Sequence, residues 1–248
     1  MVEEFISGPE MGVELIMFHG SCIFSSLMEC EKTAPPCFQG IGRFFPSCLS
    51  QYQQEQVLQE CIRAAQYLHL DHGVIDIDVK YEVNEDHRGP LILEINTRMG
   101  GNSVGFMHNA IYGIELIEHV LMCACQITVP SDIFLPKAKA AYAKMILAQR
   151  NGILNNDMNT QMFTTKLKEA LSDKSSLLTS ARCTAVAGAH VLGTCDVKDV
   201  PTILGVVIAT GETLVDAQAR VMFIHTIATQ VLNSYVLPLV EEIHDNDA

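Results

Sequence analysis

The chain has 248 residues, of which 48% are hydrophobic and 18% charged, and its formal net charge is −13 at pH 7. This composition is typical of a globular protein with a substantial core, and the length suits one or two domains. The negative charge argues against nucleic acid or an anionic membrane as a partner, because both require basic surfaces. No apolar run reaches the roughly 18 residues of a membrane span.

The cysteines and the first residues indicate a cellular compartment. Nine cysteines, an odd number, are scattered without a C-x-x-C pair, which predicts reduced thiols rather than a disulfide framework. The amino-terminal residues are acidic rather than basic, so they do not resemble a signal peptide. We therefore expect a cytoplasmic protein.

The first part of the chain reads as strands followed by one clear helix. Strands are predicted over 2–6, 11–18 and 21–28, the last two as a hairpin. A long connection with Pro and Gly follows over 29–46, and such loops often act as lids. Within it, Lys32 is a candidate phosphate contact or equally a solvated lysine. Residues 50–68 predict a helix, because Ser50 suits an N-cap with Gln53 closing a capping box.

Residues 73–103 carry the most informative pattern. Alternation in a predicted strand over 74–81 places Asp78 on one face, and Glu94 and Asn96 share a face of a strand over 91–96. Depending on the register, Asp78 lies opposite Glu94 or Asn96. Three oxygen ligands on one face suit Mg²⁺, with phosphate oxygens completing the shell. Arg98 follows and can pair with a phosphate or an oxyanion.

The alternative for this hairpin is a solvated face with charged residues, the commonest use of such side chains. The run Glu-x-Asn-x-Arg closes an otherwise apolar strand and leads into Gly-Gly, which favours a functional site. In the glycine-rich loop the backbone can approach a substrate closely. Its candidate substrate contacts are Gly100, Gly101, Asn102 and Ser103. His108 and Asn109, a few residues further on, are additional substrate candidates.

The rest of the chain alternates between helices and strands. Helices are predicted over 114–126 and 160–172 and from a Thr213 cap to about residue 233. The strands predicted in this part cover 138–148, 184–192 and 203–209. Prolines at 130 and 136 bracket a break, which predicts a domain over 1–130 and a small α+β domain over 137–248.

Three stretches resemble those of one enzyme family. LEINTRMGGNS is similar to the metal-binding strand of the ATP-grasp ligases, GVIDIDV to their preceding acidic strand, and VEEFISGPEMGVE to the hinge that holds adenine. The three occur in the family's order and cover about residues 1–125. The amino-acid ligase branch, which includes carnosine synthase and bacterial dipeptide synthases, is the most similar.

This resemblance implies an α+β fold, the carboxy-terminal ATP-grasp subdomain with an antiparallel sheet and flanking helices, plus the small appendage. It implies an ATP- and Mg²⁺- (or Mn²⁺-) dependent ligase that joins a carboxylate to an amine through an acyl phosphate, with amino acids or dipeptides as substrates. The residues implied for adenine, ribose and phosphate are Glu3, Glu4, Phe5, Ile6, Glu10 and Lys32. Those implied for the metal are Asp78, Glu94 and Asn96, with Arg98 as the catalytic cation.

Two departures from the family pattern matter. The amino-acid ligases carry a loop similar to PPYFVEIGH, and here Gly40 and Arg43 replace its Glu and His. Arg43 is therefore a candidate for binding a substrate carboxylate or phosphate instead. The family's phosphate-binding lysines and glycine-rich flap would precede residue 1. We accordingly expect a partial chain that acts with a complementary amino-terminal polypeptide or as a homo-oligomer. The alternative is a non-catalytic nucleotide-binding, metal-binding or regulatory module derived from such a ligase.

Overall fold

The computed structural model describes residues 4–33, 38–83, 88–129, 134–194 and 199–239. The first elements in chain order are β1 (Glu10–Phe18), β2 (Ser21–Cys30), β3 (Gly42–Phe45), α1 (Gln51–Tyr67), β4 (Gly73–Val83), β5 (Arg88–Asn96), α2 (Val104–Tyr112) and α3 (Leu116–Ala124). They are followed by β6 (Ala140–Leu147), β7 (Gly152–Leu154), α4 (Thr160–Leu171), the 3₁₀ helix η1 (Ser172–Leu177), β8 (Ser180–Cys183), β9 (His190–Val191), β10 (Ile203–Gly211), α5 (Leu214–Ser234) and β11 (Val236–Leu237).

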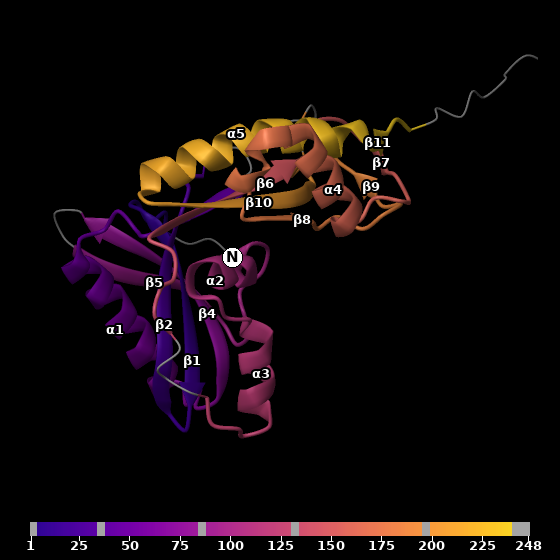
Figure 1. Cartoon of the computed structure of the whole chain (residues 1–248). Coiled ribbons are helices and arrows are strands. Elements are labelled where there is room, and N and C mark those ends of the chain that lie inside the picture. The colour runs from indigo at the N-terminus through magenta and orange to yellow at the C-terminus, as the bar shows by residue number, and fades with distance from the viewer. Residues whose placement is uncertain (1–3, 34–37, 84–87, 130–133, 195–198, 240–248) are drawn as a thin grey trace, which may run out of the picture.

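One large sheet runs through most of the described chain. Its eight strands have the order β5-β4-β1-β2-β3-β6-β10-β8, and β11, β7 and β9 form a small second sheet. The strand pairs are antiparallel in both sheets. Figure 1 shows the sheet turning between a lower part, flanked by α1, α2 and α3, and an upper part covered by α4 and α5. The predicted α+β class, with an antiparallel sheet and flanking helices, is confirmed.

The lower part of the sheet packs one apolar face against α1. Side chains at alternate positions of β1 and β4 point to the same face, and this set is fully or almost fully buried. Its members are Met11, Val13, Leu15, Met17, Ile75, Ile77, Val79 and Tyr81, which pack with Val57, Cys61 and Ala65 of α1. The predicted capping box of this helix is present, since Ser50 and Gln53 bond each other's backbone N–H groups. Local sequence signals therefore determine where α1 begins.

The opposite face of the same strands is divided into two parts. Near one end, Ile16 and Val74 are buried in a cluster with side chains of α2 and α3, including Met107 and Ile111. Towards the other end, the positions that continue this face are Glu14, Gly12 and Glu10 on β1 and Asp76, Asp78 and Lys80 on β4. The helices thus cover the apolar end, and the polar end forms the candidate site.

The upper part has an apolar core of its own. Val221 and Ile224 of α5, which packs on β10 and β6, share this core with Phe163 and Leu167 of α4, which packs on α5 and β8. The sheet is continuous across the predicted boundary between 130 and 137, because β3 pairs with β6. The division into 1–130 and 137–248 remains a prediction. In the described part of the chain, no helix has the length and apolar character needed to cross a membrane.

Several sequence-based element predictions were wrong. Residues 4–7 form no strand, although Lys80 Nζ donates to the Ile6 carbonyl at 3.0 Å and holds this segment beside β4. The predicted 29–46 connection contains β3, which pairs with β2 and β6. Helix α2 was missed, although Gly113 in the left-handed region at φ 72° marks its end. Within the strand expected over 184–192, only β9 (His190–Val191) is a strand, and β8 ends just before this range.

Candidate functional site

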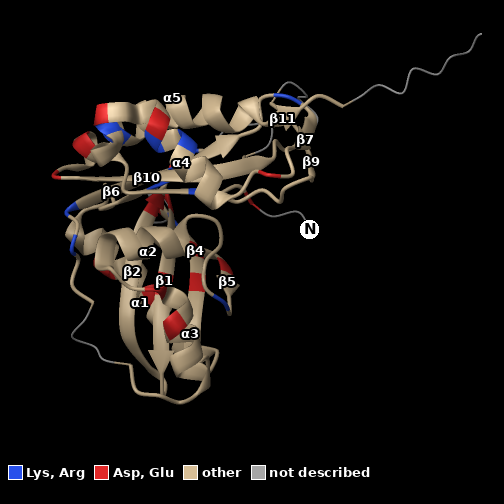
Figure 2. Cartoon of the chain, turned by 45° about the vertical axis from the view of Figure 1, so that its right-hand side comes forward, with Lys and Arg blue, Asp and Glu red and all other residues tan. Residues whose placement is uncertain are grey.

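The acidic hairpin has a defined register. Asp78 on β4 lies directly opposite Glu94 on β5, and Asp76 lies opposite Asn96. Directly opposed side chains in an antiparallel pair lie on the same face with Cβ atoms about 5 Å apart. Of the two partners that the sequence left open for Asp78, the structure therefore selects Glu94. Figure 2 shows acidic positions along β4 and β5 in the lower part of the molecule.

Two residues of strand β1 lie directly opposite the aspartates of this face. Glu14 lies opposite Asp76, and Gly12 lies opposite Asp78. Glu14 is only 1% exposed, and its Oε1 accepts the N–H of Gly100 at 2.5 Å. Glu14 was not among the residues predicted from the sequence. The sequence did contain a signal, because Glu14 is the single acid in the otherwise apolar strand GVELIMF. Burying a carboxyl group in such a strand costs free energy, which indicates a functional role.

The carboxyl groups on this face are harder to ionise than usual. The pKa of Glu14 is raised to about 9, chiefly by burial and secondly by the negative charge of Asp76. Burial also raises the pKa of Asp76, and the neighbouring Asp78 adds to this effect. The pKa of Asp78 is raised by burial as well, against the opposing effect of Arg43. Bringing positive charge to this face would favour the ionised carboxylates.

Two arginines already supply part of that charge. Arg98 Nη1 lies 3.5 Å from Asp76 Oδ2, and Arg43 Nη2 lies 3.9 Å from Asp78 Oδ1. Arg43 belongs to β3 and reaches across the sheet because position 12 is glycine. A Cβ at Gly12 would overlap the Nη1 atom of Arg43. The position of Arg43 therefore depends on a glycine two strands away.

The oxygen atoms on this face suit a hard divalent cation. Asp78, Glu94 and Asn96 provide carboxylate and amide oxygens, the ligand types that Mg²⁺ prefers. Asp76 Oδ1 and Glu14 Oε2 are buried and have no hydrogen-bond partner. Among the described residues, no three His, Cys, Asp or Glu side chains are grouped closely enough to hold a metal by themselves. The shell would therefore need Asn96 and oxygens from a bound ligand, as is common for Mg²⁺.

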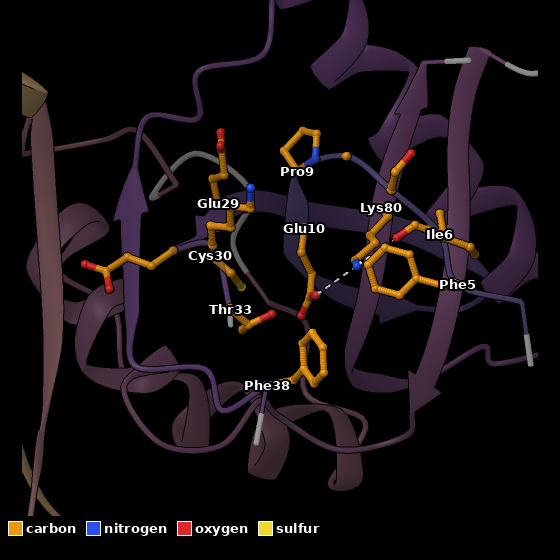
Figure 3. Close-up of a pocket in the computed structure, with 13 residues that line it drawn as sticks. Phe5, Ile6, Pro9, Glu10, Glu29, Cys30, Thr33, Phe38 and Lys80 are labelled. Atoms are coloured by element: carbon orange, nitrogen blue, oxygen red, sulfur yellow. Dashed lines mark hydrogen bonds and ion pairs between the residues drawn. The ribbon is translucent and has the colours of Figure 1, made fainter. Parts of the chain in front are cut away.

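A cavity of about 490 Å³ lies beside this face. Figure 3 shows Phe5, Ile6 and Glu10 around it, with Lys80 between them and Phe38 nearby. Its full lining is Phe5, Ile6, Ser7, Gly8, Pro9, Glu10, Glu29, Cys30, Glu31, Lys32, Thr33, Phe38 and Lys80. Aromatic and apolar side chains with a few polar groups are typical of ligand pockets.

The predicted nucleotide residues divide into three groups. Phe5, Ile6, Glu10 and Lys32 line the cavity, as a nucleotide pocket would require. Glu4 is exposed and is not part of the lining. Glu3 lies outside the described residues. The cavity brings together segments from before β1, from the end of β2 and from β4, which lie far apart in the sequence.

Lys80 is a cavity residue that the sequence motifs did not predict. Its Nζ lies 3.8 Å from Glu10 Oε2 and 5.0 Å from the centre of the Phe5 ring. Figure 3 marks the ion pair with Glu10. Since Lys80 is on the same face as Asp78, the alternation of β4 already indicated that it would lie near the acids.

The glycine-rich loop presents only some of its predicted substrate contacts. Gly101 and Asn102 are exposed, and Asn102 adopts a left-handed conformation at φ 51°. Gly100 and Ser103 are buried, so their contribution is to the shape of the loop. His108 is also buried completely and bonds Ser26, which excludes it as a surface contact for a substrate.

Comparison with curated proteins gives matches that include carnosine synthases and an uncharacterised protein of Sinorhizobium fredii. The chain is 30% identical to carnosine synthase 1 of Gallus gallus over 124 residues, which are 50% of this chain and 13% of that protein. It is 29% identical to carnosine synthase 1 of Homo sapiens over 125 residues, 50% of this chain and 15% of that protein. The chain thus matches a small part of much longer relatives. No family model matches the chain.

Solved structures extend the match to most of the chain. L-amino acid ligase from Bacillus licheniformis superposes on 90% of this chain and 53% of its own, with a TM-score of 0.68 and 18% identity. Phosphoribosylglycinamide synthetase from Anaerococcus prevotii gives the same coverage and TM-score at 19% identity. Carboxyaminoimidazole ribonucleotide synthase from Aspergillus clavatus, complexed with ATP, covers 92% of this chain and 52% of its own, with a TM-score of 0.60 and 12% identity.

These similarities define the class of the fold. The chain has the fold of the ATP-grasp ligases, and the resemblance seen in its sequence is confirmed. It spans about half the length of the solved structures that it matches. The curated sequences that it resembles over half its length include the carnosine synthases of Gallus gallus and Homo sapiens.

Proposed function

We propose that this chain forms the nucleotide- and metal-binding part of an ATP-dependent carboxylate–amine ligase that acts on amino acids or dipeptides. The observation that supports this most directly is the open polar face of β1, β4 and β5. It places Asp78, Glu94 and Asn96 in register, next to the cavity that Phe5 and Glu10 line. The sequence similarity to carnosine synthase extends over half of the chain.

In the proposed reaction a substrate carboxylate oxygen attacks the γ-phosphorus of ATP, and the bond from phosphorus to the leaving ADP oxygen breaks. The amine of the second substrate then attacks the acyl carbon. A C–N bond forms, the acyl C–O bond breaks to release phosphate, and the amine gives up a proton. Catalysis of this kind depends on positioning and on charge stabilisation more than on covalent chemistry by the protein.

The side chains have distinct roles in this proposal. Phe5 and Ile6 would hold adenine, and the Glu10 carboxylate would accept hydrogen bonds from the ribose hydroxyls. Asp78, Glu94 and Asn96 would hold Mg²⁺ or Mn²⁺, which neutralises phosphate charge when bound. Arg98 would pair with the transferred phosphoryl group and the oxyanion.

Further cations would hold the anionic parts of the ligands. Lys32 and Lys80 line the cavity and would contribute positive charge near the nucleotide. Arg43 would attract a substrate carboxylate, with Asn102 in the exposed loop close to the substrate. The activity is proposed for the whole protein, in which a complementary amino-terminal polypeptide or a second copy of the chain provides further phosphate-binding groups.

A second function is favoured by one observation. The ion pair between Arg43 and Asp78 gives the acidic face an internal cation, so a predicted metal ligand already has a charged partner. The same fold could then serve as a non-catalytic module that binds a nucleotide without turnover. The two functions predict the same nucleotide cavity and differ in catalysis.

Binding of ATP in the presence of Mg²⁺, measured by calorimetry, is the first test. We expect Asp78→Asn to weaken binding at least tenfold, whereas the matched control Asp71→Asn on an exposed loop leaves it unchanged. Phosphate release with pairs of amino acids then separates the functions, with Glu94→Gln as the inactive variant and Glu60→Gln on α1 as its control. Binding by the whole protein without turnover for any pair supports the non-catalytic module. Binding that neither Asp78→Asn nor Glu94→Gln affects would contradict both.

A further inference from the structure

Glu14 has a position that the reaction itself does not explain. It lies in the middle of β1, and neither the predicted metal set nor the cavity lining includes it. A hydrocarbon side chain of similar size would fill the same core space without a cost in polar burial. Its Oε2 is buried without a hydrogen-bond partner, while its Oε1 accepts the N–H of Gly100 at 2.5 Å. The carboxyl group is thus directed at one point of the loop that follows β5.

The loop after β5 packs tightly around the hydrogen bond between Glu14 and Gly100. A Cβ at position 100 would lie 2.5 Å from Glu14 Oε1, 2.8 Å from Val104 Cγ2 and 2.9 Å from Asp76 Oδ1. Real Cβ atoms are essentially never found below 3.0 Å from such neighbours. Only glycine therefore allows the loop to approach β1 and β4 this closely.

Arg98 lies two residues before this contact and is held at its backbone as well. The Asp76 N–H donates to the Arg98 carbonyl at 3.0 Å, and Asp76 Oδ2 lies 3.5 Å from the guanidinium. Asp76 and Glu14 are direct neighbours across β4 and β1. Two adjacent acids thus hold the loop at Arg98 and again at Gly100.

The next strand continues the same row of the sheet. Ser26 on β2 lies opposite Glu14, and its Oγ lies 2.5 Å from His108 Nε2. His108 Nδ1 lies 2.8 Å from the Val104 carbonyl, which only accepts, so Nδ1 donates. Nε2 of the neutral ring then accepts the hydroxyl hydrogen of Ser26. The row that holds the loop therefore also holds α2, the helix into which the loop leads.

We propose that Glu14 is a positioning residue, which holds Gly100 and so keeps Arg98 on the polar face beside Asn96. A neighbouring contact, from Ser26 to His108, anchors the following helix. The position of Arg98 would then be determined by the interior of the sheet rather than by solvent-exposed loop contacts. The consequence for catalysis rests on the proposed ligase function, whereas the consequence for loop order does not.

Hydrogen–deuterium exchange of the whole chain tests the loop directly. Glu14→Leu removes the acceptor and keeps the side-chain size, and we expect amides in 97–103 to exchange about tenfold faster. Glu14→Gln keeps an acceptor oxygen of the same reach and should exchange like the unaltered chain. Exchange over 74–81 reports whether the sheet itself remains intact. Equal exchange in 97–103 for all three proteins would overturn the proposal.

Gly100→Ala tests the same contact from the loop side. If Glu14→Leu does not fold, this variant decides whether the contact between Glu14 and Gly100 orders the loop. We expect it to speed exchange in 97–103 with Glu14 still present. Gly101→Ala is the matched exchange control, because a Cβ there would meet no atom within 4 Å. If Gly100→Ala exchanges no faster than Gly101→Ala, Glu14 does not hold the loop.

Turnover provides the second measurement. Glu14→Leu should lower kcat by at least tenfold with little change in the KM for ATP, and Glu14→Gln should restore most of it. A role limited to folding would not separate kcat from KM in this way. If the whole protein, assayed with a complementary amino-terminal polypeptide or as an oligomer of the chain, shows no turnover under any condition, the ligase proposal fails, and the exchange result still decides whether Glu14 positions the loop.

Discussion

The two faces of β1 and β4 differ in what they bury. Towards α1, the side chains are apolar and almost fully buried, as with Leu15 and Ile77. Towards the site, the same strands present Glu14, Asp76 and Asp78, whose pKa values are raised by burial. Since successive side chains of a strand point to opposite faces, one backbone serves both the core and the site.

The two faces of these strands have opposite effects on the stability of the fold. Burial of the α1-facing set favours folding, because apolar surface leaves water. Burial of carboxyl groups on the other face opposes folding, since their charged forms lose hydration. Residues that violate local packing rules are expected at functional sites. Substitutions on the two faces should therefore have separable effects on chemistry and on stability.

The largest effect is expected on the polar face. Arg98→Ala should reduce phosphate release by at least about 100-fold, because it removes a cation from the developing negative charge. The free energy of unfolding should change little, since the Arg98 side chain is 59% exposed. A coupled phosphate assay measures the first effect and urea denaturation the second. Arg63→Ala on the exposed side of α1 is the matched control, and an equal loss of activity there would contradict the division between the faces.

The largest loss of stability is expected on the apolar face. Ile77→Ala removes a fully buried side chain between the sheet and α1, and similar substitutions cost about 2–5 kcal/mol. Affinity for ATP per folded molecule should stay unchanged, because the neighbouring Asp76 and Asp78 point the other way. Urea denaturation and calorimetry of the same sample measure the two quantities. A change in ATP affinity larger than the change in the folded fraction would show that the faces are coupled.

Dependence on pH should distinguish the faces as well. Burial raises the pKa of Glu14 from 4.5 to about 9 in the folded protein. Between these values the folded state holds a proton that the unfolded state has lost, so stability falls as pH rises. The slope contributed by this one group reaches about 1.4 kcal/mol per pH unit. Stability linked to this proton is fully present below pH 4.5 and is lost as the pH rises through 9.

Glu14→Gln removes this titration. The variant should gain stability relative to the unaltered chain as pH increases within that window, which denaturation at several pH values would measure. Glu60→Gln on α1, where the side chain pairs with Arg63, is the control for loss of a carboxyl group away from the polar face. A Glu14→Gln difference that stays constant would mean that Glu14 is ionised in the folded protein.

The smallest effect is expected where α1 begins, far from the polar face. Ser50→Ala removes the side chain that accepts the Gln53 N–H and should cost about 1 kcal/mol. Thermal unfolding would show a small decrease in Tm, with nucleotide affinity unchanged. Ser234→Ala is the matched control, because it removes an exposed hydroxyl at the end of α5. Ser172 is not used for this purpose, because its backbone is left-handed at φ 52° and a substitution there would also change backbone strain.

Sequence patterns predicted the elements whose signals are local. The capping box at Ser50, the helix cap at Thr213 and the alternation around Asp78 are short-range features, and the structure contains all three. Elements that depend on distant partners were missed or displaced. β3 is four residues long and exists because β2 and β6 pair with it on either side.

The same distinction applies to the site. The order of Asp78, Glu94, Asn96 and Arg98 along two alternating strands was enough to indicate a polar face and a class of ligase. The contributions of Glu14 and Lys80 were not predicted, although both lie on faces that alternation defines. Their significance appears only when β1 is placed beside β4 and the segment around Ile6 is placed beside Lys80.

By itself, therefore, the sequence determined which side chains share a face, where α1 begins, and which family the motifs resemble, since these depend on spacing along the chain. The tertiary structure decided that Asp78 lies opposite Glu94, that Gly12 makes room for Arg43, and that Glu14 meets Gly100. Those contacts join residues far apart in the sequence. Strand order and register determine them, because no local pattern specifies which strands become neighbours.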